Sequence, residues 1–101
     1  MAPTKEGRAS ERFELRLPVN VVMGDVRFTA ETANVSLGGA FILTGERPPL
    51  GTRVTLQLSL PSQKEPVHVG ATVRWVDANG IGVQFDGLRA RDVWALGKLL
   101  P

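Results

Sequence analysis

The chain has 101 residues, 43% of them hydrophobic and 22% charged, which predicts a single soluble globular domain with one core. Twelve Lys and Arg residues against ten Asp and Glu give a formal charge of +2, which is too weak for general polyanion binding, so we expect no nucleic-acid polymer as a partner. Cysteine is absent, no apolar run approaches a membrane span, and the first residues are polar; the sequence therefore predicts no disulfide framework, no membrane insertion, no secretory signal and a cytoplasmic location.

The chain begins with a stretch that we interpret as a flexible arm, residues 1–18, followed by a folded domain, residues 19–101. Met1–Ser10 has no apolar periodicity, which is typical of mobile termini. We therefore expect residues 1–16 to be mobile without a ligand and to become ordered when one binds.

Two arginines on this arm are candidate ligand contacts. Arg12 and Arg16 are four residues apart, which would place both guanidinium groups on one side of a helical turn that ends before Pro18. Two planar, permanently charged groups at this spacing suit phosphate groups or guanine edges. The alternative is that they pair with Glu11 and Glu14 on a solvated face.

The rest of the chain reads as six short strands followed by one helix. Gly24-Asp25 and Asn79-Gly80 are predicted to be hairpin turns, and the Gly- and Pro-rich stretches Thr44–Thr52 and Pro61–Pro66 to be loops. Apolar residues at helical spacing predict a helix from about Arg89 to Leu100. This pattern predicts a mainly β fold, a small six-stranded antiparallel barrel with a C-terminal helix. The expected strands are Val19–Met23, Val26–Val35, Ala40–Leu43, Arg53–Leu60, Val67–Asp77 and Ile81–Phe85. In the fourth of them the alternation predicts that Val54, Leu56, Leu58 and Leu60 face inward.

A polar stretch lies where the second expected strand ends. Asn34 and Ser36 are two residues apart, so on an extended segment their side chains project to the same face. Gly38 and Gly39 follow and leave no Cβ in the way of an approaching ligand. The stretch is either a shallow ligand shelf or an Asx or Ser turn between two strands.

The residues needed for catalysis or metal binding are scarce. His68 is the only histidine and is expected to be a solvated surface residue, so a zinc or redox site has almost no ligands. Asp77, Asp86 and Asp92 lie at expected turns or at the helix start, where capping explains them. We therefore expect no enzyme activity, no metal and no cofactor.

Two motifs taken together resemble a known family. Arg12-x-x-x-Arg16, followed by a strand and then by Asn34-x-Ser36-x-x-Gly39, is similar to the signature of the PilZ domain. The resemblance covers about residues 11–100 and implies a six-stranded barrel with a terminal helix. It extends through Gly38–Ile42, Leu56–Pro61, Thr72–Val76 and Gly82–Phe85.

The family's typical ligand is cyclic di-GMP, a bacterial second messenger. The resemblance implies that Arg12 and Arg16 hold its phosphates and guanine edges. It also implies that Asn34 and Ser36 hydrogen-bond a guanine, while Gly39 leaves room for the base. A dianion with two flat bases calls for bidentate cations, in-plane hydrogen bonds and stacking surfaces.

Four further positions bear on this ligand. Glu11 stands where many members carry Arg or Lys; it should weaken binding and favour one bound nucleotide over an intercalated pair. Arg8 partly compensates for Glu11 if the arm folds back. Gly38 and Trp75 are additional candidate contacts. Trp75 either stacks on a guanine at the barrel mouth or fills the core; strand parity favours the core, and a bulge at Gly70 would reverse this.

The leading interpretation is a single-domain cyclic di-GMP receptor that acts as an adaptor on a downstream protein that the sequence does not name. The alternative is a nucleotide-independent adaptor that works through protein contacts, in motility or surface assembly. A third interpretation, a barrel that binds single-stranded nucleic acid, is disfavoured by the charge of +2 and would need a steep salt dependence of polynucleotide binding.

Overall fold

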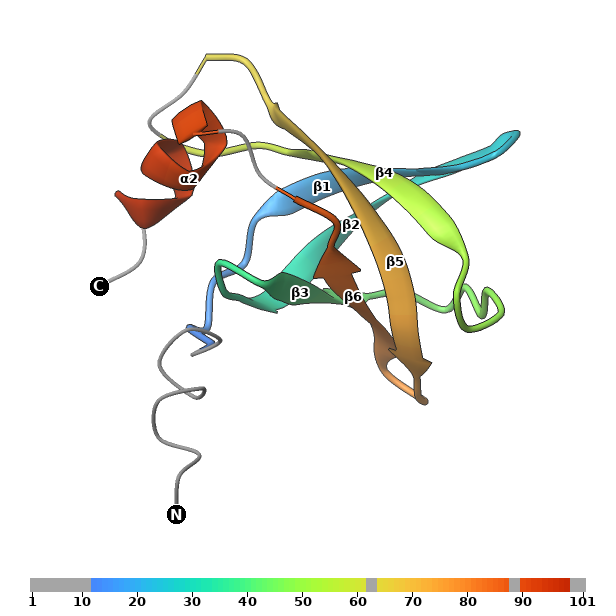
Figure 1. The fold of residues 1–101 in the computed structure, drawn as a ribbon. Helices are drawn as coiled ribbons and strands as arrows, with labels where there is room; N and C mark the ends of the chain where they lie inside the picture. Colours follow the sequence, from blue (N-terminus) through green and yellow to red (C-terminus); the bar gives the residue numbers. More distant parts are fainter. Residues whose placement is uncertain (1–11, 62–63, 88–89, 99–101) are drawn as a thin grey trace.

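Six antiparallel strands close into a barrel in the order β1-β2-β3-β6-β5-β4 (Figure 1). The computed structural model describes residues 12–61, 64–87 and 90–98, with the side chains of residues 90–93 excepted. The predicted barrel with a C-terminal helix is confirmed. The elements are β1 (Pro18–Met23), β2 (Val26–Val35), β3 (Gly39–Leu43), β4 (Arg53–Leu58), β5 (Val67–Val76), β6 (Gly80–Phe85) and α2 (Ala90–Gly97).

Alternate residues of each strand face inward, and these inward residues are mostly apolar, so the interior of the barrel forms a hydrophobic core. On α2, Ala95 and Leu96 are buried and join this core, and the helix lies at one end of the barrel, away from the tip of the β1–β2 hairpin (Figure 1). Burying one such large aliphatic side chain stabilises the fold by about 1.5–3 kcal/mol. The inward residues expected on the fourth strand, all at most 4% exposed, are Val54, Leu56, Leu58 and Leu60.

Both predicted hairpins are present, but the second turn lies one residue earlier than predicted, at Ala78-Asn79, because Gly80 is the first residue of β6 and pairs with Asp77. Gly24 adopts a φ of 57°, the left-handed conformation that glycine tolerates, between β1 and β2. Between β5 and β6, the Asp77 Oδ1 atom accepts hydrogen bonds from the backbone N–H groups of Asn79 (2.8 Å) and Gly80 (3.1 Å). The turn role predicted for Asp77 is therefore confirmed.

Residues 12–17, which we call the lead segment, are extended, so the predicted helical turn is wrong. Phe13 forms an antiparallel bridge with Val35 on β2, with two backbone hydrogen bonds of 2.9 Å. Because side chains alternate along an extended segment, residues four apart still share a side, and both arginines point outward. The exposed residues are Arg12, Glu14 and Arg16, while Phe13, Leu15 and Leu17 are half-buried or buried.

The buried hydroxyl of Thr32 fastens the lead segment to β2. Thr32 is 0% exposed, and its Oγ1 accepts a hydrogen bond from the Leu17 N–H (3.0 Å) and donates one to the Leu15 carbonyl oxygen (2.6 Å). The Thr32 N–H also donates to the Leu17 carbonyl oxygen at 3.0 Å. The lead segment therefore continues the line of β1 along β2, while residues 1–11 of the predicted arm lie outside the described residues.

Candidate functional site

Two β-bulges aim polar and aromatic side chains at the outside of the barrel. The pairing of β2 with β3 shifts between Thr32 and Asn34, and the pairing of β5 with β6 shifts between Val73 and Trp75. Each shift inserts one residue, which reverses the inward and outward alternation beyond it. Asn34 and Trp75 consequently lie on the outer surface, close to where the two strands end.

The expectation that Trp75 fills the core is wrong. The bulge lies at Arg74 and not at Gly70. The inward and outward alternation of β5 therefore reverses one residue before Trp75, and the tryptophan faces outward. Trp75 is 40% exposed, whereas Val73, on the near side of the bulge, is 0% exposed.

One row of cross-strand neighbours joins the two bulges. Asn34 pairs with Phe41, Phe41 with Gly82, and Gly82 with Trp75, so the row crosses β2, β3, β6 and β5. The rings of Phe41 and Trp75 are stacked, with their centroids 6.3 Å apart and their planes 17° from parallel. The row therefore presents a flat aromatic surface, which we call the platform and define by Phe41 and Trp75.

Arg12 of the lead segment reaches this platform. Its Nη1 atom donates a hydrogen bond of 2.8 Å to the Asn34 Oδ1 atom, and its Cζ atom lies 5.2 Å from the centroid of the Trp75 ring. A guanidinium group over an aromatic face is attracted by the ring quadrupole. Arg12 thus offers a planar cation, with N–H groups at its edge, to a flat or anionic ligand.

The second motif arginine pairs with an acid of β2. The Arg16 Nη1 atom lies 3.6 Å from the Glu31 Oε1 atom, and the two side chains are 65% and 56% exposed. Such an exposed pair contributes only about 0–1 kcal/mol and is weakened by salt. Arg16 is therefore held loosely, and a phosphate group can compete for it.

Ser36 and Gly39 build the turn between β2 and β3. Ser36 is 2% exposed, and its Oγ accepts hydrogen bonds from the N–H groups of Gly38 (3.0 Å) and Gly39 (3.1 Å). The Ser turn is thus present, and the Ser36 hydroxyl is not displayed beside Asn34. A Cβ on Gly39 would overlap the Val83 carbonyl oxygen, so the bare backbone there lets two strands approach closely. A ligand contact by either residue stays a prediction.

A further guanidinium group stands beside the platform. Arg74, the bulge residue before Trp75, donates from Nε to the Gln84 Oε1 atom at 2.7 Å, and Gln84 pairs with Gly39 across β3 and β6. The sequence analysis did not identify Arg74, Phe41 or Gly82 as residues of the site. For Arg74 a signal was present, because it directly precedes Trp75 near the end of an expected strand.

The other residues considered for chemistry have structural or solvated positions. His68 is exposed, as predicted, and among the described residues no group of three or more His, Cys, Asp and Glu side chains could hold a metal ion. The Asp86 carboxylate does not cap a turn; it pairs with Arg53 (2.8 Å) and accepts a hydrogen bond from Thr72 (2.9 Å). The Asp92 side chain lies outside the described residues.

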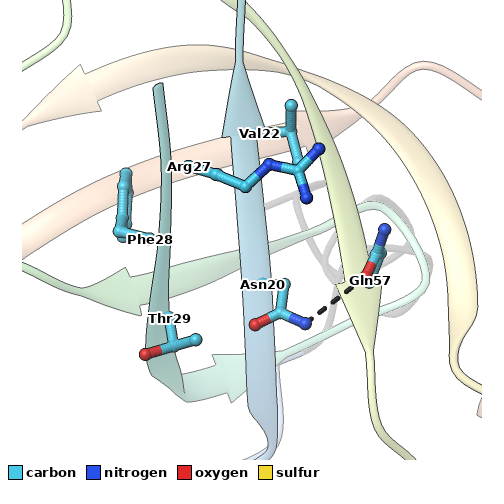
Figure 2. Close-up of a pocket in the computed structure, with 6 residues that line it drawn as sticks. All are labelled: Asn20, Val22, Arg27, Phe28, Thr29 and Gln57. Atoms are coloured by element: carbon cyan, nitrogen blue, oxygen red, sulfur yellow. Dashed lines mark hydrogen bonds between the residues drawn. The ribbon is translucent and has the colours of Figure 1, made fainter. Parts of the chain in front are cut away.

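A shallow depression of about 200 Å³ lies on the opposite wall of the barrel, where β1 runs between β2 and β4 (Figure 2). Its floor carries a hydrogen bond of 3.3 Å from the Asn20 side chain to that of Gln57, and Figure 2 shows Arg27 reaching across β1 near Val22. None of the motif residues lines this depression, so it is separate from the candidate site.

The comparison with protein families agrees with this geometry. The model of the PilZ domain matches residues 6–100. The chain belongs to the PilZ domain family. The predicted resemblance is therefore confirmed over nearly the whole sequence. No curated protein sequence matches the chain.

Three solved structures share the fold at low sequence identity. The PilZ domain of CeSA from a cellulose-synthesizing bacterium is 19% identical, with a TM-score of 0.73 over 90% of this chain and 95% of that one. The Bacillus subtilis inhibitor of motility MotI/DgrA is 20% identical, with a TM-score of 0.74 over 87% of this chain; our chain spans 46% of its length. The Borreliella burgdorferi PlzA protein in complex with c-di-GMP is 8% identical, with a TM-score of 0.65 over 97% of this chain and 37% of that one. At these identities the likeness concerns the fold.

The structure brings only part of the PilZ signature together. Arg12 and Asn34 are in direct contact, which links the two motifs. Arg16 points outward along the same lead segment but contacts Glu31. Arg8 and Glu11 lie outside the described residues, so compensation of one by the other stays a prediction. In the described part of the chain, no helix is long and apolar enough to cross a membrane.

Proposed function

We propose that this PilZ domain is a receptor for cyclic di-GMP and acts as an adaptor without catalytic activity. The observation that carries the proposal is the position of Arg12, which stacks on Trp75 while its edge bonds Asn34. A planar cation fixed between an aromatic face and an amide suits a ligand that offers both a flat base and a phosphate. PilZ domain proteins are generally receptors or adaptors, which agrees with this reading.

The proposed contacts divide between the base and the phosphates. A guanine stacks on the outer face of the Arg12 guanidinium group and bonds Asn34, while Arg16 leaves Glu31 to bind a phosphate. Ser36 and Gly39 keep the β2–β3 turn in place, and the exposed Gly38 adds no side chain there that could obstruct the ligand. The three cationic or amide contacts are Arg12, Arg16 and Asn34.

The likeness to known PilZ proteins supports the ligand class. One similar structure, PlzA, is described in complex with c-di-GMP. A cytoplasmic location is part of the proposal, because the ligand is a bacterial second messenger. The proposal needs no cofactor and no metal, and it leaves the downstream protein open.

Calorimetric titration of the purified protein with cyclic di-GMP tests the proposal. We expect a saturable heat and a rise in melting temperature, since ligand at about 100 times its Kd adds about 2.7 kcal/mol to stability. Cyclic di-AMP is the matched control, because it keeps the dianionic ring and changes only the bases. Absence of both heat and melting shift with cyclic di-GMP would contradict the receptor function.

A nucleotide-independent adaptor is the second candidate function. It is favoured by one observation, that both motif arginines already have partners within the chain, Arg12 with Asn34 and Arg16 with Glu31. One similar structure is an inhibitor of motility, MotI/DgrA, which makes motility machinery a reasonable setting. The same titration separates the two functions, because this candidate requires no response to nucleotide.

A further inference from the structure

Gly82 lies at the centre of the row that joins Asn34 to Trp75, and it carries no side chain on a wall where its neighbours do. Three glycines of β3 and β6 sit where an added Cβ would overlap another group, and they differ in which group that is. At Gly39 and Gly80 the Cβ would meet the backbone carbonyl oxygens of Val83 and Ile42. At Gly82 it would meet the Trp75 ring.

This difference separates two roles. A Cβ that strikes a backbone carbonyl forces two paired strands apart, so Gly39 and Gly80 serve the barrel itself. A Cβ that strikes a surface side chain displaces that side chain, and Trp75, at 40% exposure, has solvent to move into. Gly82 is therefore required for the position of Trp75 more than for the pairing of β5 and β6.

The position of Trp75 in turn fixes Arg12. The ring lies over Gly82 and stacks on Phe41, and the Arg12 Cζ atom is 5.2 Å from its centroid. If the ring were lifted off the barrel wall, Arg12 would lose its aromatic support while its hydrogen bond to Asn34 remained. The chain of contacts runs from Gly82 through Trp75 to Arg12, and each step is a direct contact.

We propose that Gly82 is a positioning residue of the nucleotide site: by lacking a Cβ it seats Trp75 flat against the barrel, and the seated ring holds Arg12 at the angle at which a guanine stacks on it. This inference rests on the proposed cyclic di-GMP function. It predicts that Gly82 affects affinity only when Trp75 is present.

The test is a double-mutant cycle of Gly82→Ala and Trp75→Ala. Trp94→Phe serves as the background, so that Trp75 is the only tryptophan and its emission reports its surroundings. Without nucleotide, we expect Gly82→Ala to move the Trp75 emission to longer wavelength, because the ring becomes more hydrated. With nucleotide, we expect Gly82→Ala to weaken cyclic di-GMP binding at least tenfold. In the Trp75→Ala background the same change should alter any residual affinity less than twofold, and it should lower the melting temperature less than it does with Trp75 present.

Controls keep the result interpretable. Gly87→Ala adds a Cβ with no atom within 4 Å and should change neither emission nor affinity. Phe41→Leu removes the ring stacked on Trp75 without adding atoms over Gly82, and it should shift emission and weaken binding in the same direction even if Gly82→Ala fails to fold.

The outcomes distinguish a failure of the positioning role of Gly82 from a failure of the receptor function. If Gly82→Ala binds as tightly as the parent, or if its effect on melting temperature is the same with and without Trp75, the positioning role is overturned. If the parent protein shows no binding while the emission shift and the melting-temperature coupling are present, the receptor function fails but the contact between Gly82 and Trp75 stands.

Discussion

The guanidinium carbon of Arg12 lies 5.2 Å from the centre of the Trp75 ring, although the lead segment precedes β1 and Trp75 lies on β5. Arg12 belongs to the first motif and also donates a hydrogen bond to Asn34 of the second motif. Arg12 therefore joins both motifs to the aromatic platform. An exposed cation–π contact is worth about 0.5–1 kcal/mol. It therefore orients Arg12 without contributing much to the stability of the barrel.

The first prediction concerns Arg12 itself. Arg12→Ala should lower cyclic di-GMP affinity at least about tenfold, since a charge-assisted hydrogen bond is worth roughly 1.5–3 kcal/mol. Arg12→Lys should not restore binding, because an ammonium group lacks the planar face. Calorimetry measures the affinity, and the melting temperature should stay within about 2 °C of the parent, as for other exposed substitutions. Arg27→Ala, an exposed arginine on the opposite wall, is the control. Equal losses in both variants would show a general charge effect.

The second prediction concerns the partner of Arg16. Glu31 competes with a phosphate for this arginine, so Glu31→Gln should tighten cyclic di-GMP binding by about two- to fivefold at low salt, the range expected for an exposed pair. Raising the ionic strength should remove the gain, because exposed charges are screened. Titrations at two salt concentrations measure both effects, with Glu46→Gln as an exposed control. A gain that is independent of salt, or weaker binding, would refute the competition.

The sequence predicted the parts of the fold that depend on local pattern. The inward alternation from Val54 through β4 to Leu60 and the hairpin between β5 and β6 were predicted correctly, because each is encoded in adjacent residues, although the turn of that hairpin lies one residue before Asn79-Gly80. The lead segment was misread as a helical turn. Its alternation of exposed Arg12 and Arg16 with half-buried Phe13 and buried Leu17 has the period of a strand, and that signal was present in the sequence.

The site itself was only partly predictable. The outward position of Trp75 depends on a bulge at Arg74, which arises from pairing with β6 and leaves no mark in the sequence of β5 alone. Phe41 and Gly82 join the site because they are cross-strand neighbours of Asn34 and Trp75. Register between distant strands fixes such neighbours, so a motif search finds the arginines but not the platform they use.

The third prediction concerns the Ser turn. Ser36→Ala removes the acceptor of two backbone N–H groups in a buried position, which should cost about 1–3 kcal/mol. For a domain of this size the melting temperature should fall by roughly 5 °C or more. Ser59→Ala, an exposed serine, is the control for thermal denaturation. An unchanged melting temperature with weaker nucleotide binding would instead show that the Ser36 hydroxyl contacts the ligand.

The fourth prediction concerns the attachment of the lead segment. Thr32→Val keeps the shape of the side chain but leaves the Leu17 N–H and the Leu15 carbonyl oxygen without their buried partner. The expected cost is about 1–3 kcal/mol of stability. Thr29→Val, an exposed threonine on the same strand, is the matched control.

Hydrogen exchange distinguishes this attachment from a general loss of stability. In the parent protein without nucleotide, the Phe13 amide should exchange slowly, because it bonds Val35 at 2.9 Å. The mobility predicted for residues 1–16 before ligand binding should therefore stop short of Phe13. In Thr32→Val the amides of Phe13 and Leu17 should exchange faster than those of β4, and cyclic di-GMP affinity should fall because Arg12 loses its anchored backbone. If the Phe13 amide of the parent already exchanges at the rate of an unfolded chain, the lead segment is not docked in solution, and the affinity of the Thr32→Val variant should then equal that of the parent.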